Sequence, residues 1–218
     1  MKQFIARILS LLFGLFLYAL GVVLSIKANI GYAPWEVFHV GLSQKTGISI
    51  GLASIVTGVV IVGIVLVLGE KIGLGTLCNM AIIGVFIDLI IISNVIPKQE
   101  TLVFGLLMLI MGLFVISLGT YFYIKAAFGA GPRDSLMVVL NRKTKLPIGV
   151  CRSTIEVSVT IIGWFLGGMV GPGTIISVIA IGFIIQITFA FLKFIPSAVE
   201  HETLRQTYTN LKHTAKLN

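Results

Sequence analysis

Charged residues are scarce in this sequence. Only 11% of its residues are Asp, Glu, Lys or Arg, whereas 57% are hydrophobic, and the mean hydropathy is +1.07. A soluble domain cannot bury that much apolar surface, because surface-to-volume scaling forces part of it outward. Residues 8–26, 48–69 and 101–124 contain no charge at all, and each stretch is close to the roughly 20 residues that cross a bilayer as a helix. The composition predicts an all-α integral membrane protein that contacts the lipid bilayer through several spans.

Cysteine and the common enzyme motifs are also rare or missing. The two cysteines, Cys78 and Cys151, lie in apolar segments without a second Cys or His at ligand spacing, so neither a disulfide framework nor a metal site is predicted. H-E-x-x-H, G-x-S-x-G and P-loop patterns are absent. We therefore expect no catalytic residue and no cofactor, and an intramembrane enzyme ranks a distant third among the functions considered below.

Acidic residues are half as numerous as basic ones, 8 against 16, which gives a net charge of +8. Lys and Arg cluster in the short connections and at the ends of the chain, as the positive-inside rule arranges them around cytoplasmic segments. No basic stripe with interleaved aromatics is present, so nucleic acid is not an expected partner. The charge pattern instead favours a membrane protein with both termini in the cytoplasm.

The chain contains the same pattern twice. Aligning it with itself at an offset of about 98 residues matches an ordered series of glycines together with Lys, Pro and Lys-Thr pairs. This predicts a first membrane repeat over residues 1–98, a second over 99–196 and a polar cytoplasmic tail over 197–218. Each repeat reads as a long helix, a short helix and two more long helices. The expected helices are about residues 4–28, 34–45, 48–69 and 73–96, then 101–126, 132–143, 147–168 and 172–195.

The short segments decide the topology. A helix of about 12 residues is about 18 Å long, too short for a hydrocarbon core near 30 Å, so each should be re-entrant or interfacial. Three spans per half then give two inverted repeats, six spans in all, with Lys45 and Arg142 on opposite sides of the membrane. Counting the short helices as spans would give eight spans and parallel repeats, and the distribution of basic residues fits both.

One phrase marks both halves. Residues 26–38 read IKANIGYAPWEVF, and residues 124–136 read IKAAFGAGPRDSL. Proline suits the first turn of a helix, an acid two residues later faces the positive end of the helix dipole, and glycine allows the sharp bend before them. The phrase therefore predicts a helix break and restart in each half. Its defining residues are Lys27, Gly31, Pro34 and Glu36, with the copies Lys125, Gly129, Pro132 and Asp134.

Two interpretations of this phrase remain open. Broken helices at matching positions of two halves are a sequence pointer to a transport site, where Lys27 and Lys125 would converge on an anionic group and the acids would couple a proton or cation. In the structural alternative, the lysines snorkel to the headgroups and the acids only complement the helix dipoles. Three further polar residues are candidates because ionisable groups are costly at membrane depth. These are Asp88, without a local partner, and Arg152 and Glu156, which can pair on one helix face.

The doubled K-x-x-x-G-x-x-P-x-[DE] phrase in a small two-part membrane chain resembles the bacterial YczE/YitT-type membrane proteins, with the YczE branch the closer match. The resemblance implies a multi-pass bacterial plasma-membrane protein and no particular substrate. From the inverted repeats we expect a secondary transporter or permease for a small solute, with anions among the candidates, that binds between the repeats. The alternative is a non-transporting membrane scaffold for a partner enzyme or transporter, with homo-oligomers possible in either case.

Overall fold

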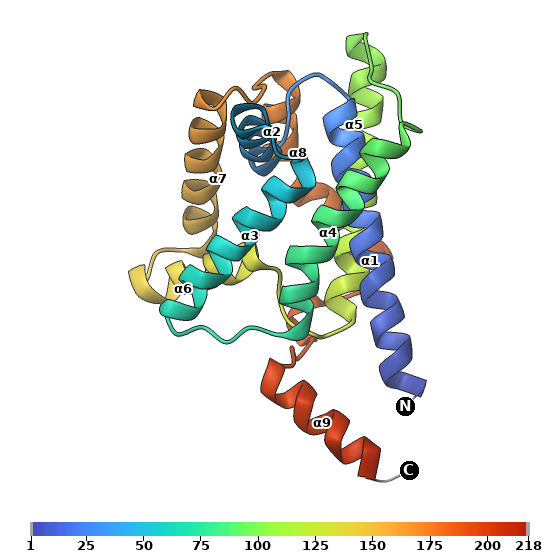
Figure 1. Cartoon of the computed structure of the whole chain (residues 1–218), viewed down its shortest axis with the longest axis vertical. Helices are drawn as coiled ribbons and strands as arrows, with labels where there is room; N and C mark the ends of the chain where they lie inside the picture. Colours follow the sequence, from blue (N-terminus) through green and yellow to red (C-terminus); the bar gives the residue numbers. More distant parts are fainter. Residues whose placement is uncertain (1, 217–218) are drawn as a thin grey trace.

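Helices account for all the regular structure in residues 2–216, the part of the chain that this computed structural model describes (Figure 1). The long and short helices follow one another in the predicted order, a long helix, a short helix and two long helices in each half. In chain order they are α1 (Lys2–Lys27), α2 (Pro34–Thr46), α3 (Ile50–Val67), α4 (Leu74–Ser93), α5 (Leu102–Lys125), α6 (Pro132–Thr144), α7 (Ile148–Phe165), α8 (Pro172–Phe191), the 3-10 turn Pro196–Ala198 and α9 (Leu204–Lys216).

Six helices within the described residues are long and apolar enough to cross a membrane. They are α1, α3, α4, α5, α7 and α8. The short helices α2 and α6 have 13 residues each, about 20 Å of helix, and are not among these candidates. The structure thus favours six spans over the alternative of eight.

The helix boundaries recur along the chain at a fixed offset of 98 residues. α2 and α6 both begin at a proline, α3 and α7 both begin at an isoleucine, and α4 and α8 begin at Leu74 and Pro172. Left-handed backbone conformations recur at the same offset. Asn29 and Gly31 have φ of 57° and 110°, and their counterparts Ala127 and Gly129 have φ of 61° and 118°. The similarity between the halves therefore extends from sequence to local backbone geometry.

Reciprocal backbone hydrogen bonds tie each half to the other. The N–H of Gly75, at the start of α4, donates to the carbonyl of Phe128 in the α5–α6 connection at 2.7 Å. The N–H of Gly173, at the start of α8, donates to the carbonyl of Ile30 in the α1–α2 connection, also at 2.7 Å. The two bonds involve equivalent residues of the two halves, so each bent connection is held by the helix start of the opposite half.

The core lies along α1 and α5, which pack side by side over most of their length (Figure 1). Glycines make this close approach possible. A Cβ on Gly14 would lie 2.8 Å from the Gly119 carbonyl oxygen, and one on Gly21 would lie 2.6 Å from the Gly112 carbonyl oxygen. In a membrane the lipid tails are as apolar as the helix side chains, so the hydrophobic effect does not drive helices together. Helices associate through close packing instead, and small residues such as glycine allow their backbones to come into contact.

The two halves differ in how their last two long helices pack. α3 packs along α4, whereas α7 makes at most minor contact with α8 within the described residues. Figure 1 shows α7 at the left edge of the molecule, standing against α2 and away from the other long helices. The second half is therefore more open than the first.

The predicted polar tail contains a helix of its own and is attached to the bundle. Glu202 forms a 2.7 Å ion pair with Arg7 of α1, and its N–H donates to the Ala127 carbonyl at 2.9 Å. α9 then extends from the lower end of the bundle (Figure 1). The last two positions of the predicted tail, 217 and 218, lie outside the described residues.

Candidate functional site

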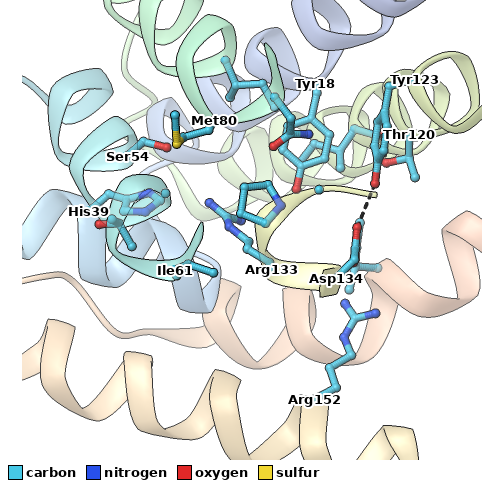
Figure 2. Close-up of a pocket in the computed structure, with 18 of the residues that line it drawn as sticks. Tyr18, His39, Ser54, Ile61, Met80, Thr120, Tyr123, Arg133, Asp134 and Arg152 are labelled. Carbon is cyan, nitrogen blue, oxygen red and sulfur yellow. Dashed lines mark hydrogen bonds between the residues drawn. The ribbon is translucent and has the colours of Figure 1, made fainter. Parts of the chain in front are cut away.

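A polar cavity of about 130 Å³ lies between the two halves (Figure 2). It has room for several water molecules or a small solute. Two smaller pockets of about 90 and 70 Å³ share its residues Tyr18, Arg133 and Arg152. Its walls come from α1, α2, α3, α4, α5, α6, α7 and α8. Its polar lining side chains are Tyr18, His39, Ser54, Thr57, Asn79, Thr120, Tyr123, Arg133, Asp134 and Arg152.

Arg133 is the charged centre of this cavity. It sits in the first turn of α6, and its guanidinium lies over the Trp35 ring, 4.6 Å from the ring centroid. Its Nη1 is 3.9 Å from Glu36 Oε1, at the limit of an ion pair. Trp35 and Arg133 occupy equivalent positions of the two halves, so the cation–π contact joins the starts of α2 and α6. The long Arg133–Glu36 distance leaves guanidinium donors available to a ligand.

The other charged groups of the cavity have closer partners. Arg152 Nε donates to Glu156 Oε1 at 2.8 Å, as the four-residue spacing on α7 predicts. The Tyr123 hydroxyl donates to Asp134 Oδ2 at 2.9 Å, and Figure 2 shows Asp134 between Tyr123 and Arg152. The facing Tyr18 hydroxyl makes no hydrogen bond within the described residues. Two arginines and two tyrosine hydroxyls therefore converge on one space with three carboxylates.

Two buried polar atoms beside the cavity have no hydrogen-bond partner among the described residues. These are His39 Nε2, on a side chain that is 2% exposed, and Ser177 Oγ, on one that is 1% exposed. His39 lines the main cavity and Ser177 lines the smaller pocket next to Glu36. A buried polar atom without a partner costs free energy, and water or a ligand in the adjoining space would remove that cost.

The starts of both short helices face this space. α2 begins after Ala33 and α6 after Gly131, and neither start has a side-chain cap. The first turns of both helices line the cavity or its side pockets. Uncapped helix N-termini carry free N–H groups and the positive end of the dipole, which favours an anion.

Burial shifts two titratable groups on α2, a helix outside the six membrane-spanning segments. Desolvation raises the pKa of the Glu36 carboxyl, and the nearby Arg133 charge acts in the opposite direction. Desolvation also holds the pKa of His39 well below its usual value, and Arg133 adds to this by repulsion. His39 is therefore neutral at pH 7.

The structure brings together some of the sequence-predicted site residues. Glu36, Asp134, Arg152 and Glu156 line the cavity or its side pockets, as do the helix-starting prolines Pro34 and Pro132. Gly31 and Gly129 serve close packing instead. A Cβ on Gly31 would lie 2.7 Å from Gly171 N, and one on Gly129 would lie 2.8 Å from Gly73 Cα.

Lys27, Lys125 and Asp88 lie apart from this cavity. Lys27 ends α1 and none of the described pockets includes it. Lys125 is exposed, and its ammonium donates to the Tyr121 hydroxyl at 3.0 Å. The Asp88 carboxylate accepts from the Ser49 hydroxyl and from the Gly51 N–H, so it holds the start of α3 against α4. We therefore leave these three residues out of the candidate site.

Several cavity residues were missed by sequence reasoning. Arg133 is the only charge in the second copy of the phrase without a charged equivalent in the first, where Trp35 stands, and this departure from the repeat was a usable signal. Tyr18, Tyr123 and His39 lie in helices where periodicity predicts a buried face but does not reveal what the face meets. No group of three or more His, Cys, Asp and Glu side chains that could hold a metal gathers among the described residues.

These features define a multi-pass helical membrane protein whose two similar halves enclose a polar cavity. The chain belongs to the family described as "Family of unknown function (DUF6198)", which it matches over residues 5–189. It is 35% identical over 175 residues to the "Uncharacterized membrane protein YczE" of Bacillus subtilis (strain 168), an alignment that covers 79% of this chain and 80% of that protein. The resemblance to YczE-type membrane proteins is thereby confirmed.

Other relatives extend the comparison. An "Uncharacterized protein" of Haemophilus influenzae (strain ATCC 51907 / DSM 11121 / KW20 / Rd) is 32% identical over 186 residues, 85% of this chain and 84% of that protein. The "Uncharacterized protein YyaS" of Bacillus subtilis (strain 168) is 28% identical over 178 residues, 80% of this chain and 88% of that protein. No solved structure matches the chain.

Proposed function

We propose that this protein is a secondary transporter or permease for a small solute with an anionic group, which binds in the cavity between the two halves. The observation that carries the proposal is the meeting of two uncapped short-helix starts, one from each half, with Arg133 and Arg152. Broken helices whose N-termini point at an anionic substrate group near the middle of the membrane are a recurring transporter device. The proposal assigns binding and translocation to the cavity and no catalysis.

The proposed architecture is a pair of inverted repeats. Equivalent helices run in opposite directions in Figure 1: α3 descends from its start while α7 ascends, and α4 ascends while α8 descends. The recurrence of helix boundaries at an offset of 98 residues supports the same interpretation. In such a fold, relative movement of the halves around a fixed site exposes that site to each side of the membrane in turn.

The proposed location is the bacterial plasma membrane, with both termini in the cytoplasm. Support comes from the charge pattern, which concentrates Lys and Arg at the ends and in short connections. In Figure 1 α2 lies in the upper part of the bundle and α6 in the lower part, which supports the proposal that Lys45 of α2 and Arg142 of α6 face opposite sides of the membrane.

A binding and uptake experiment tests the function. The purified protein is screened by thermal shift against mono- and dicarboxylates, inorganic phosphate and amino acids, and the compounds that stabilise it are then offered, radiolabelled, to proteoliposomes. We expect at least one compound to bind and accumulate. Arg133→Gln should weaken its binding about 10- to 100-fold, because a charge-assisted contact is worth about 1.5–3 kcal/mol.

Arg142→Gln is the matched control. Arg142 lies on the same helix but pairs with Glu70 at 2.8 Å, outside the cavity, so its loss should leave binding unchanged. The proposal is wrong if no compound binds or accumulates with folded protein in the vesicles, or if the two variants behave alike. Failure of uptake together with specific co-purification of a membrane enzyme or transporter would favour the scaffold alternative.

A further inference from the structure

An apolar groove of about 420 Å³ separates α7 from α8. The two helices meet at the short connection between them and diverge toward the other end. Side chains from both helices face the groove, among them Ser153 and Val157 of α7 and Val178 and Ile179 of α8. The equivalent helices of the first half, α3 and α4, pack along each other instead.

The glycines that permit the close contact between α3 and α4 have equivalents in α7 and α8. A Cβ on Gly51 would collide with the Gly84 carbonyl oxygen, and one on Gly84 would lie 2.5 Å from the Gly51 carbonyl oxygen. Their equivalents are Gly149 and Gly182, where an added Cβ would meet nothing within 4 Å. α7 and α8 therefore have glycines at the positions where α3 and α4 cross closely, but α7 and α8 do not cross closely in this structure.

Polar groups follow the same pattern. In the first half, the Gly51 N–H donates to Asp88 Oδ1 at 2.8 Å, which connects the start of α3 to α4. The residue equivalent to Asp88 is Gln186, an exposed side chain within the apolar helix α8 that has no hydrogen bond in the described part of the chain. The Gly149 N–H also has no acceptor there. The Gly149 N–H is one of the first-turn donors that have no partner within their own helix, Gln186 lies within an apolar helix, and one movement would join the two.

The far end of α7 is firmly attached and provides a pivot. A Cβ on Gly163 would lie 2.5 Å from Phe38 N of α2, and one on Gly168 would collide with the Val37 carbonyl oxygen. Gly167, between the last turn of α7 and α8, has φ of 105°. The contact with α2 therefore holds the upper end of α7 in Figure 1. At its lower end α7 is joined to α6 by the connection 145–147, and the space beside Gly149 is open.

We propose that α7 closes on α8 by swinging about Gly163–Gly168, so that Gly149 and Gly182 cross in contact and the Gln186 amide oxygen accepts from the Gly149 N–H. The closed pair reproduces the α3–α4 pair of the first half. The movement is largest at the lower end of α7 in Figure 1, because the upper end stays against α2. It acts as a gate on the open side of the second half, and it also shifts Arg152 and Glu156 because α7 carries both.

Disulfide cross-linking in membranes tests this movement. A Cβ on Gly84 would lie 2.5 Å from Ile55 Cγ1, and the equivalent pair in the second half is Gly182 and Ser153. In a background of Cys78→Ser and Cys151→Ser, the double variant Ser153→Cys/Gly182→Cys should form a disulfide under mild oxidation. Disulfide formation is measured with a maleimide-coupled polymer, which reacts with free thiols and shifts the protein on a gel. A disulfide removes the free thiols and so abolishes the shift. Both sites are open in this structure, so the substitutions should not disturb folding.

Two controls make the result specific. Ser153→Cys/Phe183→Cys places the second thiol on the exposed neighbour of Gly182, about 100° around the helix from the crossing point. This pair should remain at least tenfold less cross-linked. Adding Gly149→Leu to the reporting pair fills the crossing point and should also reduce cross-linking at least tenfold. A second reporting pair, Ser153→Cys/Ile179→Cys, places its α8 thiol one turn away on the groove wall and guards against a folding defect in the first.

The gate is overturned if neither reporting pair cross-links while both thiols react after solubilisation, which is the result expected of a groove permanently filled by lipid. It is also overturned if the Phe183 control pair cross-links equally well. The gate extends the proposed transport function but fails separately from it. Cross-linking without uptake of any solute would support the movement of α7 and contradict the transport function. Uptake without cross-linking would support the transport function and contradict the movement.

Discussion

The two halves of this protein have equivalent helices but pack them differently. α3 and α4 form a tight pair through Gly51 and Gly84, while α7 and α8 diverge although glycines are retained at both equivalent positions. The difference arises at the neighbouring short helix. Gly163 and Gly168 let α7 approach the α2 backbone, whereas the equivalent residues of α3 and its connection are Val65 and Glu70. Small residues thus permit a close helix crossing but do not enforce it, because a competing surface can hold the helix elsewhere.

The same contrast extends to the charged groups of the cavity. Asp134 of the second half accepts a 2.9 Å hydrogen bond from Tyr123, while its equivalent, Glu36, faces the Arg133 guanidinium at 3.9 Å and makes no side-chain hydrogen bond of this length in the described structure. Equivalent backbone positions therefore present different chemistry to the shared space. A pair of similar halves can supply a symmetric frame and still build one asymmetric site.

The largest expected effect comes from adding a methyl group to the tight helix pair. Gly51→Ala would drive a carbon into the Gly84 carbonyl oxygen, so α3 and α4 must separate. Overpacking of this kind costs about 1–3 kcal/mol. We expect the thermal unfolding midpoint in detergent to fall by several degrees, and Gly149→Ala, which meets nothing, to leave it unchanged. Equal midpoints for the two variants would contradict the contrast between the halves.

A smaller effect is expected at the polar residues of the same pairs. Asp88→Ala removes the acceptor for the Gly51 N–H and the Ser49 hydroxyl, which should lower the free energy of unfolding by about 1–2 kcal/mol. Gln186→Ala removes no hydrogen bond present in the described structure and should melt like the parent.

Chemical unfolding of purified Asp88→Ala, Asp88→Asn and Gln186→Ala by a denaturing detergent distinguishes these expectations. Asp88→Asn keeps one acceptor oxygen and should lie between Asp88→Ala and the parent. If Gln186→Ala is destabilised as strongly as Asp88→Ala, the second pair is already closed in solution, and the contrast between the halves disappears.

Sequence reasoning predicted the local structure of this protein well because its signals are local. Pro34 and Pro132 start the short helices, and the uncharged runs coincide with candidate spans. Equivalent positive φ angles at Gly31 and Gly129 fit the predicted bends. Each of these features depends on neighbours within one or two turns, and a single sequence contains that information.

The composition of the cavity was less predictable, because it depends on contacts between distant helices. Lys27 and Lys125 share the phrase with Glu36 and Asp134, yet the lysines end their helices away from the cavity, whereas the acids lie in the first turns of the next helices and line the cavity or its side pocket. The bend at the glycine separates them in space. Asp88 was singled out because it lacks a local partner, and its partners are 37 and 39 residues away in sequence. Only the three-dimensional packing distinguishes a helix-holding acid from one that lines a cavity.

The smallest expected effect concerns two neighbouring tyrosines that line the cavity, Tyr18 on α1 and Tyr123 on α5. Their ring centroids are 6.5 Å apart in an edge-to-face contact. Only the Tyr123 hydroxyl has a partner in the described structure, Asp134. Removing one hydrogen bond costs about 1 kcal/mol, so Tyr123→Phe should lower stability by about that much, and Tyr18→Phe should leave stability unchanged.

Ligand binding should reverse the order of the two variants. An unpartnered Tyr18 hydroxyl facing the cavity is free to bind a solute, and its loss should weaken binding of the solute found in the thermal-shift screen by up to about tenfold. The Tyr123 hydroxyl is already engaged with Asp134, so Tyr123→Phe should change affinity less than stability. Melting curves and titrations of both variants test the two properties separately. A Tyr18→Phe protein that melts early but binds normally would show that its hydroxyl supports the helix bundle, and the solute would then have to be held by the second half, through Arg133 and Arg152.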